Sequence, residues 1–528
     1  MKTKTLLLLW CLCSLTISAQ NRLHVNQTKG SDGNNGKTWL QAFATVQKAL
    51  DNAKSGDEIW VAAGTYLPSK KILDADSEGR PTSDRYKTFV IPSGVKMFGG
   101  FPSNAVNNTG LDKRDWEINS TILSGDLNND DGDDFSRMED NVYGVVHLFN
   151  ADETTVIDGF TITGGNMDSP VPLRMVVGSG IRAVSESSKP SSPTLRNLII
   201  EGNNSSGGGA GFSNYAGGDA CPVISNTIFR RNRSGEYGGG FANEALWKSS
   251  PILENVIISG NQAFNGGGMY CLSQDIETAP VLTNVLVTGN LAKNAAGGIC
   301  LYSYAGAVKP VLTNVTIAGN KAEADIGGLY CLAYSAVSLP QIRNTVFWEN
   351  KGTECNDFYN KGGTGSIPEI QSCLIEDTFT PTEMRSYNPF VEAIDADQAP
   401  TTAGNYRPNP LDLHLLVNQG NNAFVTAATD LDGKPRIVDT TVDIGAYEYQ
   451  ELTSAGISAT YSNKSIWADA GTLYISIDRP AVVRIYSIDG LLIQQNNIGE
   501  GVYMVSLPAG FYIVSLNNET QTKVYISR

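Results

Sequence analysis

The strongest constraint on the fold of this chain is a sequence repeat between Pro193 and Asn350. Its copies begin PTLRNLIIEGN, PVISNTIFRRN, PILENVIISGN, PVLTNVLVTGN, PVLTNVTIAGN and PQIRNTVFWEN. Each copy starts at a proline, and successive prolines are 29 or 30 residues apart: Pro193, Pro222, Pro251, Pro280, Pro310 and Pro340. A fixed period in this range is typical of repeat proteins, in which each copy stacks on the next.

The makeup of one copy indicates short strands separated by bends. Runs of Val, Ile, Leu, Phe and Thr favour strands, and they are too short and too often interrupted for helices. A glycine cluster follows, as in GGGFAN and GGGMYC. The fifth and the eleventh position of every copy are asparagine, which like glycine tolerates the positive φ of a tight bend.

Two further positions carry the apolar side chains that stacking would bury. The third and the eighth position are aliphatic or aromatic in every copy: Leu195, Ile224, Leu253, Leu282, Leu312 and Ile342, then Ile200, Phe229, Ile258, Val287, Ile317 and Phe347. Stacked copies would turn these positions into columns, and each asparagine amide would reach its copy one strand spacing away, about 4.8 Å. The sequence therefore predicts an all-β fold, a right-handed parallel β-helix. Leucine-rich and helical repeats fit less well, because their hydrophobic patterns differ.

Charge and the N-terminus indicate where the protein acts. The 528 residues carry a formal net charge of −15, whereas nucleic acid and anionic membranes call for a basic surface. Residues 1–19 combine two lysines, an apolar core and small residues before Gln20, the pattern of a secretory signal peptide. We therefore expect an exported monomer, extracellular or at the cell surface, that binds no nucleic acid.

Six cysteines follow the signal peptide, and export permits disulfides between them. Cys271, Cys300 and Cys331 come just after the glycine clusters of successive copies, where they can stack as small side chains. Cys300 is one place out of phase with the other two. We expect free, structural thiols and no zinc site, since no CxxC or Cys/His spacing is present.

The chain divides into four parts. After the signal peptide, residues 20–450 form the β-helix, with the regular repeats at 193–350 and a closing segment at 405–449. Apolar residues at helical spacing between 42 and 53 predict a short N-terminal capping helix ahead of a first coil near residue 55. Residues 451–464 are interpreted as a linker. Alternating strands and turns at 465–528 predict a small, separate C-terminal β-sandwich.

Several stretches match known kinds of secreted protein. The opening WLQAFATVQKALDNAKSGDEIWVAAGTY resembles secreted β-helix proteins of the Bacteroidetes, and TDLDGKPRIVDTTVDIGAYE resembles the C-terminal motif of the choice-of-anchor Q group. The repeats are similar to those of polymorphic outer-membrane proteins and of the pectate-lyase-like superfamily. Residues 482–528 resemble the sorting domain of the type IX secretion system. That resemblance implies association with an outer membrane and secretion and sorting machinery as partners. It indicates little about activity, because this fold hosts enzymes and binders alike.

The densest acidic run, SGDLNNDDGDD, predicts a calcium loop, and no other cofactor is expected. Its oxygen ligands alternate and are followed by a glycine, as in calcium-binding loops; they are Asp126, Asn128, Asp130 and Asp133. The spacing departs from the EF-hand pattern, because the glycine falls at the seventh place and no Glu closes the loop at the twelfth. A solvated polar loop is the alternative, and a structural role for the ion is favoured over a catalytic one.

Aromatic residues that recur after the glycine clusters form a second candidate site. Side chains alternate along a strand, so some tyrosines should point outward while neighbours such as Phe241 and Met269 point into the core. An exposed column of aromatic rings can stack on sugar rings, whereas tyrosines that only cover a sheet face are the alternative. The candidate glycan-facing residues are Tyr270, Tyr302, Tyr330 and Trp247.

Catalytic motifs are sparse, and no catalytic residue is predicted. The paired carboxylates with GHG and RIK motifs of polygalacturonases are missing, and His24, His147 and His414 stand alone. A lyase would need an Arg or Lys base beside calcium-binding carboxylates. An arginine cluster at 230–233 lies near Glu236, but such a loop is more often a solvated face. We therefore predict a binding or adhesion protein for a glycan or a host or cell-surface component. The alternative is a polysaccharide lyase or glycoside hydrolase of the pectate-lyase-like superfamily.

Overall fold

The computed structural model describes residues 21–72, 83–168, 179–378, 389–410, 412–450, 465–469, 472–477, 480–487, 491–499, 501–508, 510–516 and 520–526. The predicted signal peptide at 1–19 and the predicted linker at 451–464 lie outside the described residues. The chain divides into two compact units, Met1–Gln450 and Glu451–Arg528. Among the described helices, none has the length and apolar character needed to span a membrane.

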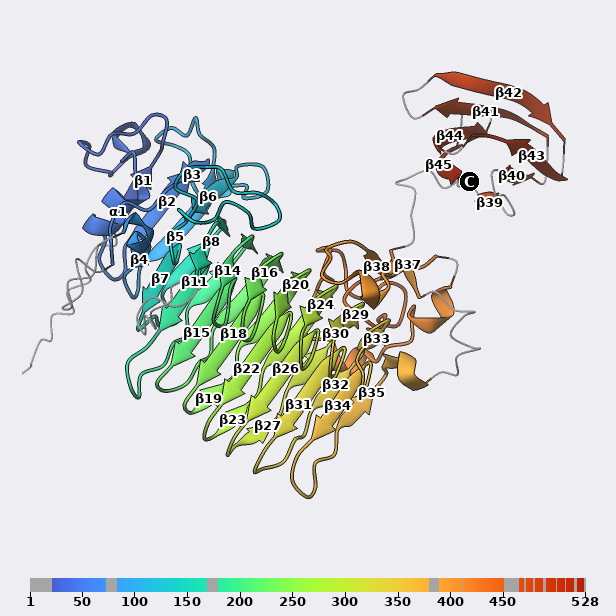
Figure 1. Cartoon of the computed structure of the whole chain (residues 1–528). Helices are drawn as coiled ribbons and strands as arrows, with labels where there is room; N and C mark the ends of the chain where they lie inside the picture. The colour runs from blue at the N-terminus through green and yellow to red at the C-terminus, as the bar shows by residue number, and fades with distance from the viewer. Residues whose placement is uncertain are drawn as a thin grey trace, which may run out of the picture. The chain divides into compact units, whose positions relative to one another are not determined.

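The first unit is a parallel β-helix, as the repeats predict, in which each coil adds strands to sheets that run along the stack (Figure 1). One of these is a parallel nine-stranded sheet. In spatial order it contains β4 (Phe89–Ile91), β7 (Val146–Phe149), β11 (Ile181–Val184), β15 (Phe212–Ala216), β18 (Phe241–Ala245), β22 (Met269–Ser273), β26 (Ile299–Ser303), β31 (Leu329–Ala333) and β34 (Phe358–Lys361).

A wider parallel sheet consists of two ribbons that merge in the middle of the stack. The first ribbon contains β1 (Arg22–Val25), β2 (Glu58–Ala62), β5 (Lys96–Phe101), β8 (Val156–Asp158) and β12 (Thr194–Arg196), and the second β3 (Gly64–Tyr66), β6 (Thr121–Ser124), β9 (Thr161–Thr163) and β13 (Ile199–Glu201). Both join β16 (Val223–Arg230), β20 (Ile252–Ser259) and β24 (Val281–Thr288). They separate again into β28 (Val311–Thr313), β32 (Gln341–Arg343) and β35 (Glu369–Gln371), and β29 (Thr316–Ala318), β33 (Val346–Trp348) and β36 (Leu374–Ile375).

Two narrow parallel sheets complete the coils. The six-stranded sheet contains β10 (Asn166–Met167), β14 (Asn204–Ser205), β17 (Arg233–Ser234), β21 (Gln262–Ala263), β25 (Leu291–Ala292) and β30 (Lys321–Ala322). The three-stranded sheet contains β19 (Lys248–Ser249), β23 (Glu277–Thr278) and β27 (Ala307–Val308). Short 3₁₀ turns occur at Trp39–Gln41, Asp84–Tyr86, Leu111–Lys113, Glu376–Thr378, Ala396–Gln398, Leu413–Leu415 and Asn422–Phe424.

The positions fixed in the repeat build the core and the bends. The side chains in the two apolar columns are at most 1% exposed. The fifth-position asparagines all have positive φ, between 46° and 55°. The eleventh-position asparagines form a buried ladder, of which Asn261 is representative: its Oδ1 accepts from the backbone N–H and Nδ2 of Asn232, each at 3.0 Å, and its Nδ2 donates to Asn290 Oδ1 at 3.0 Å. Stacking alone therefore accounts for the invariant residues.

The N-terminal end of the stack begins earlier than residue 55. Strand β1 pairs in parallel with β2, so the first strand of the wide sheet is at Arg22–Val25. The sequence did not predict this strand, because the strand is short and contains the polar His24. In the structure His24 is buried beside Trp39, with ring centroids 4.8 Å apart. The predicted capping helix is present as α1 (Val46–Asn52), which buries one face against β1, β2 and β4.

The closing segment folds back over the outer face of the wide sheet, near its C-terminal end. Its strand β38 (Asn405–Pro408) pairs antiparallel with β37 (Phe390–Glu392), which precedes the segment. Apolar side chains of this segment pack on outward-facing residues of the sheet, among them Leu286 and Trp348. The fifth-position asparagines of the first three copies are partly or fully exposed. Those of the last three donate to backbone carbonyls of the closing segment: Asn284 to Thr429 at 2.7 Å, Asn314 to Asp443 at 3.0 Å and Asn344 to Asn421 at 3.1 Å.

The second unit is built from two antiparallel sheets, as expected for the small C-terminal β-sandwich. One contains β39 (Ser465–Asp469), β40 (Thr472–Ile477) and β43 (Gly501–Ser506), and the other β42 (Leu492–Ile498), β41 (Ala481–Ser487), β44 (Gly510–Leu516) and β45 (Thr520–Ile526). A single core cluster contains side chains from both sheets, including Leu473, Ile475, Val483 and Val514.

Candidate functional site

The outer face of the nine-stranded sheet carries two rows of side chains, because alternate residues of each strand point away from the core. In the strand register, the first row consists of His147, Arg182, Ser213, Ala242, Tyr270, Cys300, Tyr330 and Tyr359. The second row consists of Phe149, Val184, Tyr215, Glu244, Leu272, Tyr302, Leu332 and Lys361. Arg182 and Glu244 therefore lie in the N-terminal and middle part of this face, most of the tyrosines lie toward its C-terminal end, and Lys361 is on the last strand.

Three of the four predicted glycan-facing residues share this face. Tyr270 and Tyr330 lie in the first row, Tyr302 lies in the second, and all three are partly exposed. Trp247 is 39% exposed but lies in the turn after β18, at the margin of the sheet. Tyr304 adds an exposed ring, in edge contact with Tyr302 at 4.7 Å between centroids. The structure thus brings together a tyrosine face, made of Tyr270, Tyr302, Tyr304 and Tyr330.

The cysteines near this face follow the predicted phase difference. Cys271 and Cys331 are buried on the core side, in one column with Leu301 between them, whereas Cys300 belongs to the outer row. All six cysteines among the described residues are free. Burial raises the pKa of the Cys300 thiol to about 12, so it is not a nucleophile at neutral pH.

A pocket of about 450 Å³ opens at the N-terminal end of the tyrosine face. Its lining comes from three neighbouring strands and the turns before them: Arg182, Val184, Gly208, Ser213, Tyr215, Tyr237 and Glu244. The ring of Tyr237 stacks on Tyr270 with centroids 4.9 Å apart, so the pocket continues into the tyrosine face. Below, this cavity is called the Arg182 pocket.

Burial governs the electrostatics of the Arg182 pocket. It raises the pKa of Glu244 to about 7, against the charge of Arg182 and a hydrogen bond from Tyr237, which both lower it. Burial also lowers the pKa of Arg182, although a guanidinium stays charged at neutral pH. His147, adjacent in the row, has its pKa lowered to about 4 by burial and by the charge of Arg182, so it is neutral at pH 7. The pocket thus combines a fixed positive charge with a carboxyl group that titrates near neutrality.

Sequence reading missed Arg182 and Glu244 for different reasons. Arg182 precedes the regular repeats, so no register places it on a face of the sheet. Glu244 lies within a repeat, where it occupies the outward position held by Tyr215 and Leu272 in the neighbouring copies. The sequence did contain a signal for Glu244: a carboxylate stands in a column of aromatic and aliphatic residues. Function in a repeat protein resides in positions that vary between copies.

The acidic loop assembles a different set of carboxylates from the predicted one. Asp126, Asp130 and Asp140 each place an oxygen within 4.8 Å of the other two. Asn128 contributes its backbone N–H, which donates to Asp140 Oδ2 at 2.9 Å. Asp133 is exposed and lies outside this group. Two of the predicted ligands are therefore brought together, and Asp140 joins them because the loop turns back on itself.

Charge repulsion is concentrated in this loop. Burial, with the charges of Asp126, Asp140 and Asp130, raises the pKa of Asp131 to about 6, in spite of a hydrogen bond from Asn141 at 2.7 Å. One oxygen each of Asp130 and Asp131 is buried with no hydrogen-bond partner among the described residues. Calcium would relieve this repulsion, and its binding here stays a prediction.

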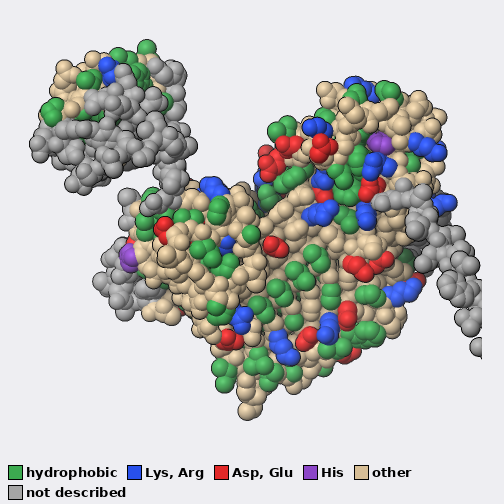
Figure 2. All heavy atoms as spheres, turned by 180° about the vertical axis from the view of Figure 1, so that it is seen from behind, with side chains coloured by type: hydrophobic (Ala, Val, Ile, Leu, Met, Phe, Trp, Pro, Cys, Tyr) green, Lys and Arg blue, Asp and Glu red, His purple; other side chains and the backbone are tan. Residues whose placement is uncertain are grey.

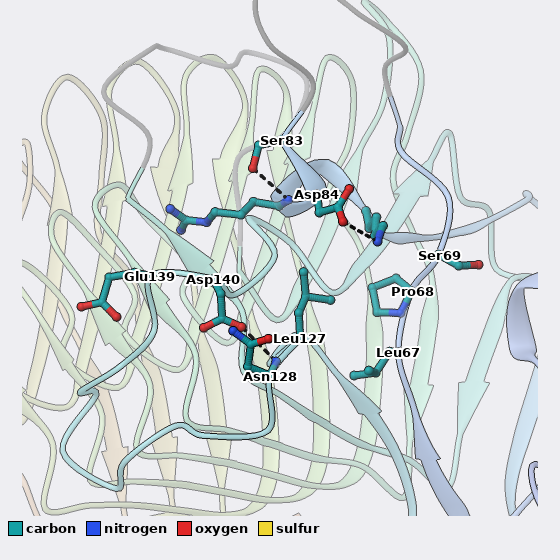
Figure 3. Close-up of a pocket in the computed structure, with 11 residues that line it drawn as sticks. Leu67, Pro68, Ser69, Ser83, Asp84, Leu127, Asn128, Glu139 and Asp140 are labelled. Carbon is teal, nitrogen blue, oxygen red and sulfur yellow. Dashed lines mark hydrogen bonds and ion pairs between the residues drawn. The ribbon is translucent and has the colours of Figure 1, made fainter.

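A cavity of about 580 Å³ lies beside the acidic loop (Figure 3). Asn128 and Asp140 line one side of it, and Leu67 and Pro68 another. Asp84, which also lines it, is engaged by lysines, with Lys87 Nζ at 2.9 Å and Lys71 Nζ at 3.1 Å. The Asp84 charge is therefore already balanced, and the acidic loop alone supplies carboxylates for a cation.

Calcium is expected to raise the melting temperature of the first unit, because the ion binds the folded loop in preference to the unfolded chain. Asp140→Asn should abolish this shift and Asp133→Asn should leave it intact, since only Asp140 belongs to the carboxylate group. Calorimetry of the wild type and of both variants, in calcium and in chelator, measures the shift in melting temperature. A wild-type protein that melts at one temperature in the two solutions would refute the site.

Two arginines of the cluster considered for a lyase base are engaged in ion pairs. Arg230 and Arg231 both pair with Glu201, at 2.7 and 2.9 Å. Although burial raises the pKa of Glu201, its hydrogen bonds and charge interactions with the two arginines leave that pKa below its usual value. This carboxylate is charged at neutral pH and is not a proton donor. On the face drawn in Figure 2, positive and negative side chains are interspersed between rows of hydrophobic ones.

Comparison with known proteins does not assign the chain to a family. No protein-family model matches the chain, and no curated protein sequence matches it. Nine solved chains are similar in structure. Pectate lyase Pel9A is 11% identical, with a TM-score of 0.41 over 82% of this chain and 98% of that one. A rhamnogalacturonan lyase is 11% identical, with a TM-score of 0.35 over 74% and 97%.

A GH136 lacto-N-biosidase from Eubacterium ramulus is 10% identical, with a TM-score of 0.25 over 67% of this chain and 68% of that one. Scores this low carry no argument about activity. The strand pairing of the chain itself establishes the class, a parallel β-helix protein with an antiparallel C-terminal unit.

Proposed function

We propose that this chain is an exported β-helix protein that binds a glycan, or another host or cell-surface component, through its tyrosine face. The observation that carries the proposal is the group of partly exposed tyrosines on adjacent strands, Tyr270, Tyr302 and Tyr330. A tyrosine ring offers a flat apolar surface while its hydroxyl stays in water, a combination that suits the apolar face of a sugar ring.

The spacing of the tyrosines favours a linear ligand. Tyr270 and Tyr330 lie in the same row two strands apart, with Cys300 between them, which corresponds to about 9.6 Å along the stack. This distance is comparable with the length of a disaccharide unit. A polysaccharide that runs along the stack could therefore place equivalent rings on both tyrosines.

The C-terminal unit is proposed to direct the protein to the cell surface. Deletion of residues 465–528 should leave the β-helix folded but retained in the periplasm, because the two units have separate cores. Cell fractionation with a folding assay on the recovered protein measures this. Surface display of the truncated chain at the wild-type level would refute the sorting role.

A lyase is the second candidate function, and the Arg182 pocket is the observation that favours it. A carboxyl group with a pKa of about 7, as in Glu244, suits proton transfer near neutral pH. A hydrolase of the usual kind needs a second carboxyl group across the scissile bond. Glu244 is the one carboxyl group among the described residues that line this pocket, so the geometry supports a lyase better than a hydrolase.

Affinity gels that contain acidic and neutral glycans test the two functions together. If the protein binds glycans without cleaving them, we expect retention of the full-length protein in the gel and no new ultraviolet absorbance from unsaturated sugar. Tyr302→Ala should weaken retention, whereas Tyr143→Ala, a partly exposed tyrosine outside the tyrosine face, should not. Release of unsaturated product would establish the lyase instead, and migration unaffected by every glycan would refute the binder.

A further inference from the structure

The guanidinium of Arg182 is incompletely satisfied. Its Nη1 donates to Ser213 Oγ at 2.6 Å, whereas Nε is buried with no hydrogen-bond partner among the described residues. No described carboxylate forms an ion pair with it, in contrast to Arg114 and Arg196, which both pair with Asp158. The charge of Glu244 acts on Arg182 without an ion pair between them, so this desolvated cation is incompletely compensated and the pocket favours the entry of an anion.

The surroundings of Arg182 fit an oxygen anion attached to a sugar. A guanidinium presents donors in a plane that matches the oxygens of a carboxylate or a sulfate ester. The walls of the pocket are the rings of Tyr215 and Tyr237, and Tyr237 stacks on Tyr270. An anionic sugar unit held at Arg182 would therefore place the next units of the chain over the tyrosine face.

Glu244 makes this pocket sensitive to pH. The charged and titratable groups that act on its carboxyl are Arg182, Tyr237 and Glu236, and Tyr270 lies close by. Below its pKa of about 7 the carboxyl is neutral and leaves the positive charge of Arg182 uncompensated. Above it, the carboxylate both attracts Arg182 and repels an incoming anion. Binding of an anion should therefore weaken as pH rises through neutrality.

We propose that the Arg182 pocket binds an anionic oxygen group of a glycan, a carboxylate or a sulfate ester, so that the ligand of the tyrosine face is an acidic polysaccharide. The proposal rests on the glycan binding proposed above and adds the charge of the ligand, the residue that recognises it and the direction of the pH dependence.

Calorimetric titration of the full-length protein tests the proposal with three probes: a short oligogalacturonate, the same oligomer with its carboxyl groups methyl-esterified, and a sulfated dextran oligomer. We expect the wild type to bind one of the two anionic probes about tenfold to a hundredfold more tightly than the ester, the range for hydrogen bonds to a charged group. Which anionic probe binds more tightly identifies the anion.

Two pocket variants and one control separate the pocket from the tyrosine face. Arg182→Gln should lose the preference for the anionic probe and keep the affinity for the ester. Arg230→Gln, in which the exposed arginine paired with Glu201 on the wide sheet is replaced, should keep both. Glu244→Gln should keep the preference and lose its decline at alkaline pH, because the glutamine cannot acquire charge.

Each contrary result has a distinct meaning. Affinity for both anionic probes no higher than for the ester, or an unchanged preference in Arg182→Gln, would overturn the pocket and leave glycan binding in place. No affinity for any of the probes would overturn glycan binding as well. If Arg182→Gln does not fold, competition in the wild type decides: galacturonate or a galactose sulfate ester, whichever matches the preferred probe, should displace the oligomer more effectively than methyl galactoside. Displacement by both anionic sugars no better than by methyl galactoside would overturn the proposal.

Discussion

Replacing Arg436 by Met is expected to lower the free energy of unfolding of the first unit by about 3–5 kcal/mol, the cost of breaking a buried charge network. Arg436 is 1% exposed, and its two terminal nitrogens donate to the carbonyls of Ala446 at 3.0 Å, Gly445 at 2.5 Å and Asp443 at 3.2 Å. Methionine fills similar space but leaves these buried carbonyls without their donor.

The acidic partners of Arg436 make the loss more severe. Asp430 accepts from the backbone N–H groups of Asp432 and Glu448, each at 3.0 Å, so the motif folds around its own carboxylates. Among the described residues of this segment Arg436 is the buried cation, and its removal takes away the positive charge that acts on Asp430, Asp443 and Glu448. We therefore expect the closing segment to detach before the coils unfold.

Limited proteolysis and calorimetry measure this effect. Arg436→Met should speed cleavage within residues 412–450 and lower the melting temperature of the first unit. Arg407→Met is the matched control, because Arg407 belongs to the same segment but pairs with Asp432 at the surface, where an ion pair contributes at most about 1 kcal/mol. Equal effects of the two substitutions would contradict the structural role of the motif.

Asn261→Ala is the second large effect, with an expected cost of about 3 kcal/mol from buried groups that lose their partners. The backbone N–H of Asn232 loses its acceptor, Asn261 Oδ1, and the Phe229 carbonyl loses a donor at 2.9 Å. Asn232 and Phe229 are at most 1% exposed, so bulk solvent does not reach these groups.

Chemical denaturation of the full-length chain measures the effect of Asn261→Ala. Its control is Asn255→Gly in the outer column, where φ is 55°. The Asn255 side chain donates to Asn226 at 3.2 Å and accepts from Asn284 at 3.1 Å, and Asn284 keeps its bond to the Thr429 carbonyl in the variant. Glycine adopts that conformation freely, so the control should change stability by less than about 1 kcal/mol. A smaller loss for Asn261→Ala than for Asn255→Gly would show that the inner ladder is not a main source of stability.

The coils could be predicted from the sequence because their structure repeats. The parts of the fold held by contacts that occur only once could not be predicted. The columns through Leu195 and Ile200 follow from a period that can be counted. The placement of the closing segment depends on contacts such as that between Asn284 and Thr429, which are 145 residues apart and have no periodic signal. The resemblance of this segment to a known motif stays a prediction, and it gave no placement for the segment. The buried Arg436 supplies a physical role for the arginine of this stretch.

The candidate site shows the same division. Alternation along the strands predicted that Tyr270 and Tyr330 point outward, as they do. Arg182 precedes the regular repeats, so only the three-dimensional register places it two strands from Glu244. The acidic loop gathers Asp140 instead of Asp133, because loop geometry and not spacing determines which carboxylates meet.

Hydroxyl-radical footprinting with a short oligogalacturonate tests the central claim, that the tyrosine face is the binding surface, most directly. Tyrosine and methionine side chains are oxidised according to their exposure, so a ligand protects those that it covers. The account predicts reduced oxidation at Tyr270, Tyr302 and Tyr330 and no change at Tyr143 or at Met504, which is 61% exposed in the second unit. Protection confined to other parts of the chain, with the three tyrosines oxidised as before, would contradict it.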